Sequence, residues 1–206
     1  MKIIVWNSQD KCVADYHRLI RGCDVLCLLD CGQWTVPMYA LQIQKGLFHW
    51  KVEHEGLSYD IFYCLEKVAF VCRDGLYSGE SVLYSIHSNI GSLIGIRLQD
   101  DFWLFAHHEP NLVNAYHIGE FYLREISDRF RKAAFIADFK KKSYSWVQET
   151  VGKLYCIALP EGYYPHTVNY LFTIHVACTD LYLLEGYSET SNPVSYTHLR
   201  AHETRH

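Results

Sequence analysis

A chain of 206 residues, half of them hydrophobic and 15% aromatic, is long enough to bury the core of one domain and too apolar to be disordered. Its formal net charge of −4 at pH 7 excludes an overall basic surface that would hold nucleic acid nonspecifically. The longest apolar run near the start, Ile3 to Trp6, is too short for a signal peptide or a membrane span. We therefore expect a cytoplasmic, monomeric protein whose eight cysteines are reduced thiols rather than disulfides.

The beginning of the chain is predicted to form a strand, a helix and a second strand. The first apolar run ends in the amide of Asn7, which is typical of a short buried strand followed by a turn. Ser8 or Asp10 can cap the helix that follows. The second apolar run ends at Asp30, so this acid is predicted to lie at the end of a buried strand.

The middle of the chain alternates apolar runs with turn residues, which predicts a series of strands. The expected strands cover residues 56–64, 68–72, 81–86, 92–98 and 102–106. Gln99-Asp100-Asp101 predicts a tight hairpin turn between the last two. The last strand is followed by His107, so a titratable ring stands at its end.

The best helix signal lies between residues 118 and 130. Apolar or aromatic residues recur there every four positions, at Ile118, Tyr122, Ile126 and Phe130. This helix leads into a strand that ends at Asp138, and a weaker helix is expected at 146–151. Final strands are expected at 169–174 and 181–184. Many strands with two or three helices predict one α+β domain or a layered sandwich.

Three cysteines surround the second predicted strand at intervals of four residues: Cys23, Cys27 and Cys31. In an extended strand, this spacing places the three thiols on one face but about 13 Å apart from end to end. One tetrahedral zinc ion cannot bind all three over that span. We therefore expect them to pack as small apolar side chains.

The end of the chain does not resemble natural protein sequence. Residues 194–204 read Val-Ser-Tyr-Thr-His-Leu-Arg-Ala-His-Glu-Thr, which looks like the translation of a transposase adaptor used in DNA sequencing libraries. We therefore expect a truncated domain over residues 1–192 and a non-native tail over residues 193–206 that is not part of the natural fold. On this interpretation the natural C-terminus is missing, and the spaced histidines of the tail are not a metal site.

Polar residues stand at the ends of five predicted strands: Asn7, Asp30, His107, Asp138 and Asn169. Each one alone has a structural explanation, because Asp and Asn commonly begin turns. Strand ends on one edge of a sheet converge, however, and a buried strand that ends in an acid can fix a catalytic carboxylate. The five together therefore predict a functional site.

The same stretches resemble the ordered motifs of the endonuclease/exonuclease/phosphatase superfamily. The resemblance rests on Trp6-Asn7, Asp24 to Gly32, Gly95 through His107, and Ala137-Asp138-Phe139. The resemblance extends from Met1 to Asn192. Within the superfamily, the chain is most similar to the nuclease subunit of cytolethal distending toxin and to small bacterial members. It implies a deoxyribonuclease I-like fold, a four-layer α/β/β/α sandwich, incomplete at the C-terminus. It also implies Mg²⁺- or Mn²⁺-dependent cleavage of DNA or another phosphate ester.

The resemblance implies a role for each matching residue. Asn7 would help to position the metal, and Asp30 stands where the family has a metal-binding Glu. His107 would donate a hydrogen bond to a phosphate oxygen, and Asp138 would orient the attacking water. Glu66 matches an acidic residue of the family only weakly and is better explained as a turn residue.

Some positions depart from the family pattern. Lys140 replaces an Asn, and Asn169 replaces a later catalytic Asp. The closing Ser-Asp-His of the family would fall at or beyond the end of the natural segment. One unit charge about 5 Å from a cation is equivalent to roughly 3 kcal/mol at an effective dielectric near 20, so metal binding is weakened unless Lys140 points outward. Lys140 and Arg97 are instead candidates for binding the substrate phosphate.

Three functional hypotheses remain open from the sequence. The first is a metal-dependent phosphodiesterase or nuclease whose site is weakened by these substitutions and by truncation. The second is a catalytically inactive relative that binds nucleic acid or a protein partner, which the substitutions motivate. The third is a phosphatase that acts on a small phosphorylated molecule, which is compatible with the acidic net charge.

Overall fold

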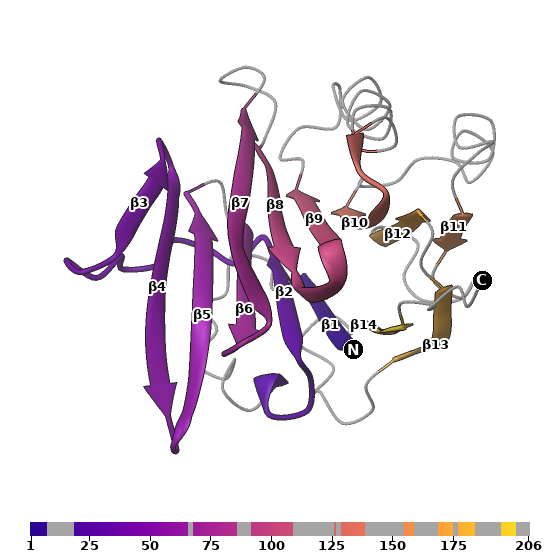
Figure 1. The fold of residues 1–206 in the computed structure, drawn as a ribbon, viewed down its shortest axis with the longest axis horizontal. Helices are drawn as coiled ribbons and strands as arrows, with labels where there is room; N and C mark the ends of the chain where they lie inside the picture. The colour runs from indigo at the N-terminus through magenta and orange to yellow at the C-terminus, as the bar shows by residue number, and fades with distance from the viewer. Residues whose placement is uncertain are drawn as a thin grey trace.

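The computed structural model describes residues 1–7, 19–65, 68–85, 92–108, 126, 129–138, 155–158, 169–174, 177–183 and 195–200. These residues form an eight-stranded and a six-stranded β-sheet (Figure 1). From one edge to the other, the eight-stranded sheet contains β13 (Ala177–Leu183), β14 (Ser195–Arg200), β1 (Lys2–Asn7), β2 (Val25–Leu29), β6 (Val68–Arg73), β5 (Leu57–Cys64), β4 (Leu47–His54) and β3 (Leu41–Gln44).

The six-stranded sheet contains, in spatial order, β11 (Tyr155–Ala158), β12 (Asn169–Ile174), β10 (Lys132–Asp138), β9 (Phe102–His108), β8 (Ser92–Leu98) and β7 (Tyr77–Ser85). The expected tight turn between β8 and β9 is the short 3-10 segment η1 (Gln99–Asp101). In Figure 1, β4 and β5 form a long hairpin whose turn lies at the bottom of the view, and β3 lies beside β4 at the sheet edge.

Two strand pairs are parallel, and both contribute to the candidate site. β1 pairs with β2 and β9 pairs with β10 in parallel register, whereas the other described pairs are antiparallel. Parallel neighbours require a long crossover connection, usually a helix. The described residues of these two crossovers that are helical are Leu19, Ile20, Ile126 and Arg129, within the helices that the sequence predicted.

Alternating apolar side chains bury one face of each sheet against the other. One core cluster contains residues from both sheets, including Val25 and Leu29 of β2 with Leu104 and Ala106 of β9. A second cluster, which includes Leu26 and Leu28, lies on the other face of the eight-stranded sheet. Both faces of β2 are therefore buried, which explains its unbroken apolar sequence.

Most strands with long apolar runs were predicted correctly, β7 and β13 were predicted over only part of their length, and three strands were not predicted. β1, β2, β5, β6, β8, β9, β10 and β12 lie where the sequence predicted strands. β3, β4 and β11 were missed. In β4 the side chains alternate only loosely between buried and exposed positions, so no apolar run marks it. The weaker helix expected at 146–151 lies outside the described residues.

The three spaced cysteines are buried thiols, as expected, but they do not share one face. Cys27 packs in the core between the sheets, whereas Cys23 and Cys31 pack in the cluster on the opposite face. The prediction failed because β2 spans only Val25–Leu29, so the outer two thiols lie beyond the strand. Burial raises the pKa of Cys23 to about 12 and that of Cys27 well above its ordinary value, so both remain protonated.

The expected non-native tail contains a described strand. β14 pairs antiparallel with both β1 and β13, with Thr197 opposite Ile3 in the register. Because this pairing involves only the backbone, it does not test whether residues 193–206 are foreign. Their foreign origin stays a prediction. Within the described part of the chain, none of the helical segments has the length and apolar character needed to cross a bilayer.

Candidate functional site

The ends of β1 and β2 lie side by side. Their parallel register places Asn7, the last residue of β1, opposite Leu29, the last residue of β2. Asp30 follows Leu29 directly, so these two predicted site residues share one edge of the eight-stranded sheet. The structure gives the backbone position of Asn7 and both the backbone and the side chain of Asp30.

The ends of β9, β10 and β12 meet in the same way in the six-stranded sheet. Asp138 lies opposite His108 in the parallel register and opposite Asn169 in the antiparallel register. His107 lies opposite Ala137, one position earlier. Neighbouring strands are separated by about 5 Å, so these backbones form one compact row.

A contact between the two sheets joins these two rows. His108 Nε2 lies 4.0 Å from Asp30 Oδ2, and both side chains are largely shielded from solvent, with 3% and 16% of their surface exposed. The strand ends of both sheets therefore meet at one rim of the sandwich. The structure brings together the backbones of all five strand-end residues predicted from the sequence, and His108 in addition.

The two adjacent histidines face opposite sides of the six-stranded sheet. Leu104 and Ala106 belong to the core between the sheets, so alternation along β9 places His108 on that side. Trp103 and Phe105 stack on the other side, where both contact Phe130. His107 shares that second side. His108 is not among the site residues predicted from the sequence, because its role depends on which face of β9 is turned to the other sheet, and the sequence alone does not show this.

The turn that carries Asp30 has an unusual backbone. Asp30 has φ 51° and Gly32 has φ 72°, both in the left-handed region. A residue with a Cβ adopts this conformation at a cost of about 1–2 kcal/mol, although Asp tolerates it better than most. Strained backbone of this kind is frequent where a side chain must be presented to a ligand.

Arg97 does not join this rim. It lies opposite Trp103 in the β8–β9 register, near the other end of the sheet. Its guanidinium group forms ion pairs with Glu80 at 2.8 Å and with Asp101 at 3.0 Å. The remaining two candidates, Glu66 and Lys140, lie outside the described residues.

The residues at the rim carry the kinds of oxygen donor that a hard divalent cation prefers. Asp30 and Asp138 carry carboxylates and Asn7 and Asn169 carry amides, which are the oxygen donors that Mg²⁺ and Mn²⁺ prefer. Among the residues whose side chains the structure describes, no group of three His, Cys, Asp or Glu is arranged to hold a metal. Asp30 is thus the one residue of these four oxygen donors whose side chain the structure describes.

Comparison with known proteins reveals the fold. No protein-family model and no curated protein matches the chain. Among solved structures, the cytolethal distending toxin of Haemophilus ducreyi is 14% identical with a TM-score of 0.59, over 95% of this chain and 96% of that one. An endonuclease/exonuclease/phosphatase from Beutenbergia cavernae is 13% identical with a TM-score of 0.57, over 98% of this chain and 71% of that one.

A third similar structure is the 3′ phosphatase NExo from Neisseria, bound to a product DNA hairpin. It is 12% identical with a TM-score of 0.54, over 95% of this chain and 98% of that one. Identities this low establish a shared fold alone. The chain therefore has the fold of endonuclease/exonuclease/phosphatase-type proteins, which confirms the deoxyribonuclease I-like fold expected from the sequence.

Proposed function

We propose that the protein is a divalent-metal-dependent phosphodiesterase that hydrolyses nucleic acid, with its active site at the rim where Asp30 meets His108. The observation that carries this proposal is the 4.0 Å contact between those two side chains, which joins the strand ends of both sheets. The backbone register of Asp138 and Asn169 beside His108 adds an acid and an amide to the same rim. The fold shared with the DNA-bound 3′ phosphatase supports DNA as the substrate class.

Each residue of the rim has a distinct task in this proposal. Asp30, with help from Asn7, binds the cation through oxygen. A divalent cation held by these residues would supply Lewis-acid chemistry, that is, polarisation of the phosphoryl oxygen and compensation of the negative charge that develops during cleavage. Asp138 orients the attacking water. Asn169, which lies opposite Asp138 in the register, helps Asp138 in this task.

The hydrogen-bond donor to the phosphate is assigned to His108 rather than to its neighbour. Its ring lies on the inner side of the sheet with Asp30, whereas His107 lies on the side of Trp103 and Phe105. Hydrogen bonds at catalytic sites are often long before a substrate binds, so 4.0 Å is compatible with this task. The net charge of −4 means that the substrate must be attracted locally, by the cation and His108.

The test is hydrolysis of plasmid DNA and of bis(4-nitrophenyl) phosphate with Mg²⁺, with Mn²⁺ and with a chelator, at matched concentrations of wild type and Asp138→Ala. The proposal predicts metal-dependent turnover that Asp138→Ala abolishes. No metal-dependent turnover, or equal turnover in the variant, rejects it. DNA binding that needs no metal and leads to no cleavage would favour the inactive relative, and cleavage of phosphate monoesters alone would favour the small-molecule phosphatase.

A further inference from the structure

The left-handed turn after β2 is held by two aromatic side chains, Tyr63 and Trp34. Both pack on the face of the eight-stranded sheet that is turned away from the six-stranded sheet. The Tyr63 hydroxyl on β5 donates a hydrogen bond to the carbonyl oxygen of Gly32 at 3.2 Å. The same hydroxyl accepts a hydrogen bond from the backbone N–H of Trp34 at 3.1 Å. The Trp34 indole Nε1–H in turn donates to the carbonyl oxygen of Cys31 at 3.1 Å. The two residues that follow Asp30 are thus both fixed through their carbonyl groups.

The rings that carry these donors are themselves fixed by packing. Trp34 stacks on Tyr63 with ring centroids 5.6 Å apart and an angle of 11° between the planes. Trp50 on β4 packs edge-on against both, at 6.3 Å from Trp34 and 6.5 Å from Tyr63. The hydroxyl of Tyr63 therefore has little freedom to turn away, because its ring is fully buried between aromatic neighbours.

We propose that Tyr63 is a positioning residue for metal binding, because its hydroxyl holds the turn in the backbone conformation that presents the Asp30 carboxylate to the rim. Asp30 cannot reach the same position from an extended backbone, since one residue of continued strand would turn its side chain to the opposite face. This inference rests on the proposed function only in its metal-binding part. The clamp on the turn itself is independent of any activity.

A second tyrosine on the same strand supplies the matched control. Tyr59 lies four residues before Tyr63 on β5, on the same face of the sheet, and is equally buried. Its hydroxyl has no hydrogen-bond partner among the residues that the structure describes. Tyr59→Phe and Tyr63→Phe therefore remove the same atom from the same cluster, but only the second removes a link to the turn.

Two measurements on the full chain test the clamp. Amide hydrogen exchange of residues 31–34 is expected to be about three- to tenfold faster in Tyr63→Phe than in wild type, which is the range for the loss of one or two hydrogen bonds. Calorimetric titration with Mn²⁺ alone is expected to show binding weakened by a similar factor of about three to ten. Tyr59→Phe is expected to match wild type in both measurements.

Equal exchange and equal Mn²⁺ binding in Tyr63→Phe and Tyr59→Phe would overturn the inference. Faster exchange with unchanged Mn²⁺ affinity would overturn the positioning role and leave only a structural clamp. If wild type itself binds no Mn²⁺, the proposed function fails with it, whereas the exchange result still decides whether the clamp exists. Should Tyr63→Phe not fold, Trp34→Phe removes the indole donor to Cys31 and is held to the same expectations.

Discussion

The two acids that flank β2 have very different surroundings. Asp24, before the strand, accepts a hydrogen bond from the backbone N–H of Lys2 at 2.8 Å and lies 3.6 Å from the guanidinium of Arg73. Asp30, after the strand, has a left-handed backbone and lies 4.0 Å from the His108 ring. Asp24 is thus tied to a backbone N–H and a guanidinium in the eight-stranded sheet, whereas Asp30 begins a strained turn and faces the other sheet. In the function proposed above, the Asp30 end of the sandwich is the one that binds the ligand.

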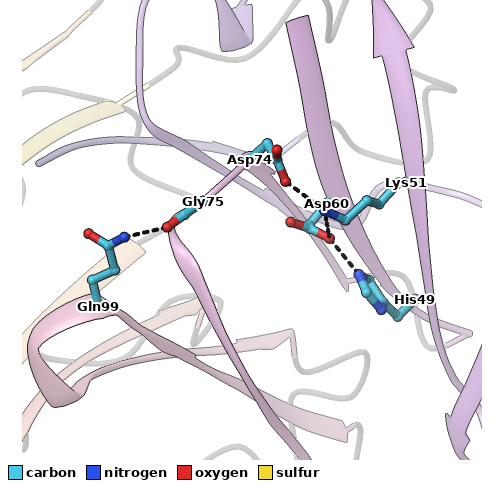
Figure 2. Close-up of polar contacts among 6 residues, drawn as sticks. All are labelled: His49, Lys51, Asp60, Asp74, Gly75 and Gln99. Atoms are coloured by element: carbon cyan, nitrogen blue, oxygen red, sulfur yellow. Dashed lines mark hydrogen bonds and ion pairs between the residues drawn. The ribbon is translucent and has the colours of Figure 1, made fainter.

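The contrast extends to the other polar groups near Asp24. The buried carboxylate of Asp60 lies 2.7 Å from His49 Nε2 and 3.9 Å from Lys51 Nζ, and Lys51 lies 2.6 Å from Asp74 (Figure 2). Asp60 is opposite Cys72, which is opposite Val25, the first residue of β2. The cluster is therefore about 17 Å from the level of Asp30 along the strands.

Contacts between the two sheets also stabilise the Asp24 end of the sandwich. The side-chain amide of Gln99 in η1 donates to the carbonyl oxygen of Gly75, as Figure 2 shows, and the Gln99 backbone N–H donates to the carbonyl oxygen of Leu76 at 3.0 Å. Tyr77 packs against both His49 and Phe62. Polar groups that neutralise each other at short distances stabilise a fold, so we interpret this end as structural.

Replacing each of the two flanking acids by its amide should produce the largest difference in turnover between two variants. Asp30→Asn is expected to reduce metal-dependent turnover at least about 1,000-fold, because a unit charge about 2 Å from a divalent ion is equivalent to several kcal/mol even at an effective dielectric near 20. Asp24→Asn is expected to leave turnover per folded molecule unchanged and to lower the free energy of unfolding by about 1 kcal/mol. Steady-state kinetics and urea unfolding measure the two effects, and a similar loss of turnover in both variants would contradict the comparison.

The two histidines of β9 provide the next contrast. His108→Ala is expected to reduce turnover about 100-fold, because it removes a donor to the phosphate. His107→Ala is expected to reduce turnover by a much smaller factor, since its ring lies on the other side of the sheet. Kinetics at saturating Mn²⁺ distinguish them, and a greater loss in His107→Ala would restore the role that the sequence assigned to that residue.

The buried acid of the structural end should affect stability and not turnover. Asp60→Ala removes the partner of His49 from a site where only 2% of the residue is exposed. We expect the free energy of unfolding to fall by about 3 kcal/mol, as for other broken buried pairs. Thermal and urea unfolding measure this loss, with Asp74→Ala as the exposed control. A drop in turnover per folded molecule would show that this end also serves the active site.

The smallest effect is expected from Asp74. The hydrogen bond from Lys51 lowers the pKa of Asp74, and the same contact raises the pKa of Lys51. A carboxyl whose pKa is lowered by folding stabilises the protein above its unfolded pKa of about 4, and this contribution disappears as pH falls through the folded value. Asp74→Asn should therefore be slightly less stable than wild type near neutral pH and equal to it in strong acid. A difference that grows on acidification would contradict this account.

The strands of the candidate site could be predicted because their sequences are unbroken apolar runs that end at a polar residue. The apolar runs before Asp30 and Asp138 mark the strands, and the acids mark where they end. β3 and β4 could not be found in this way, because their side chains are half exposed and their pairing depends on distant partners.

The sequence could not predict which face of a strand a residue points to, or how far along the strand from the site it lies. Which of His107 and His108 faces inward depends on the packing of the two sheets, and Arg97 was assigned a site role although the register places it near η1. The cysteine spacing failed for a related reason, because the left-handed turn at Asp30 ends the regular alternation before Cys31. Local sequence determines that a strand exists, whereas neighbouring strands determine what its residues face.

The most direct test of the account is paramagnetic broadening of histidine ring signals by Mn²⁺ in solution. With the cation bound at Asp30, the His108 ring lies within a few ångströms of it, whereas His49 lies near the opposite end of the sandwich. The account predicts that substoichiometric Mn²⁺ broadens the His108 signals and leaves those of His49 sharp, and that Asp30→Asn removes the effect. Equal broadening of both rings, or selective broadening of His49, would contradict it.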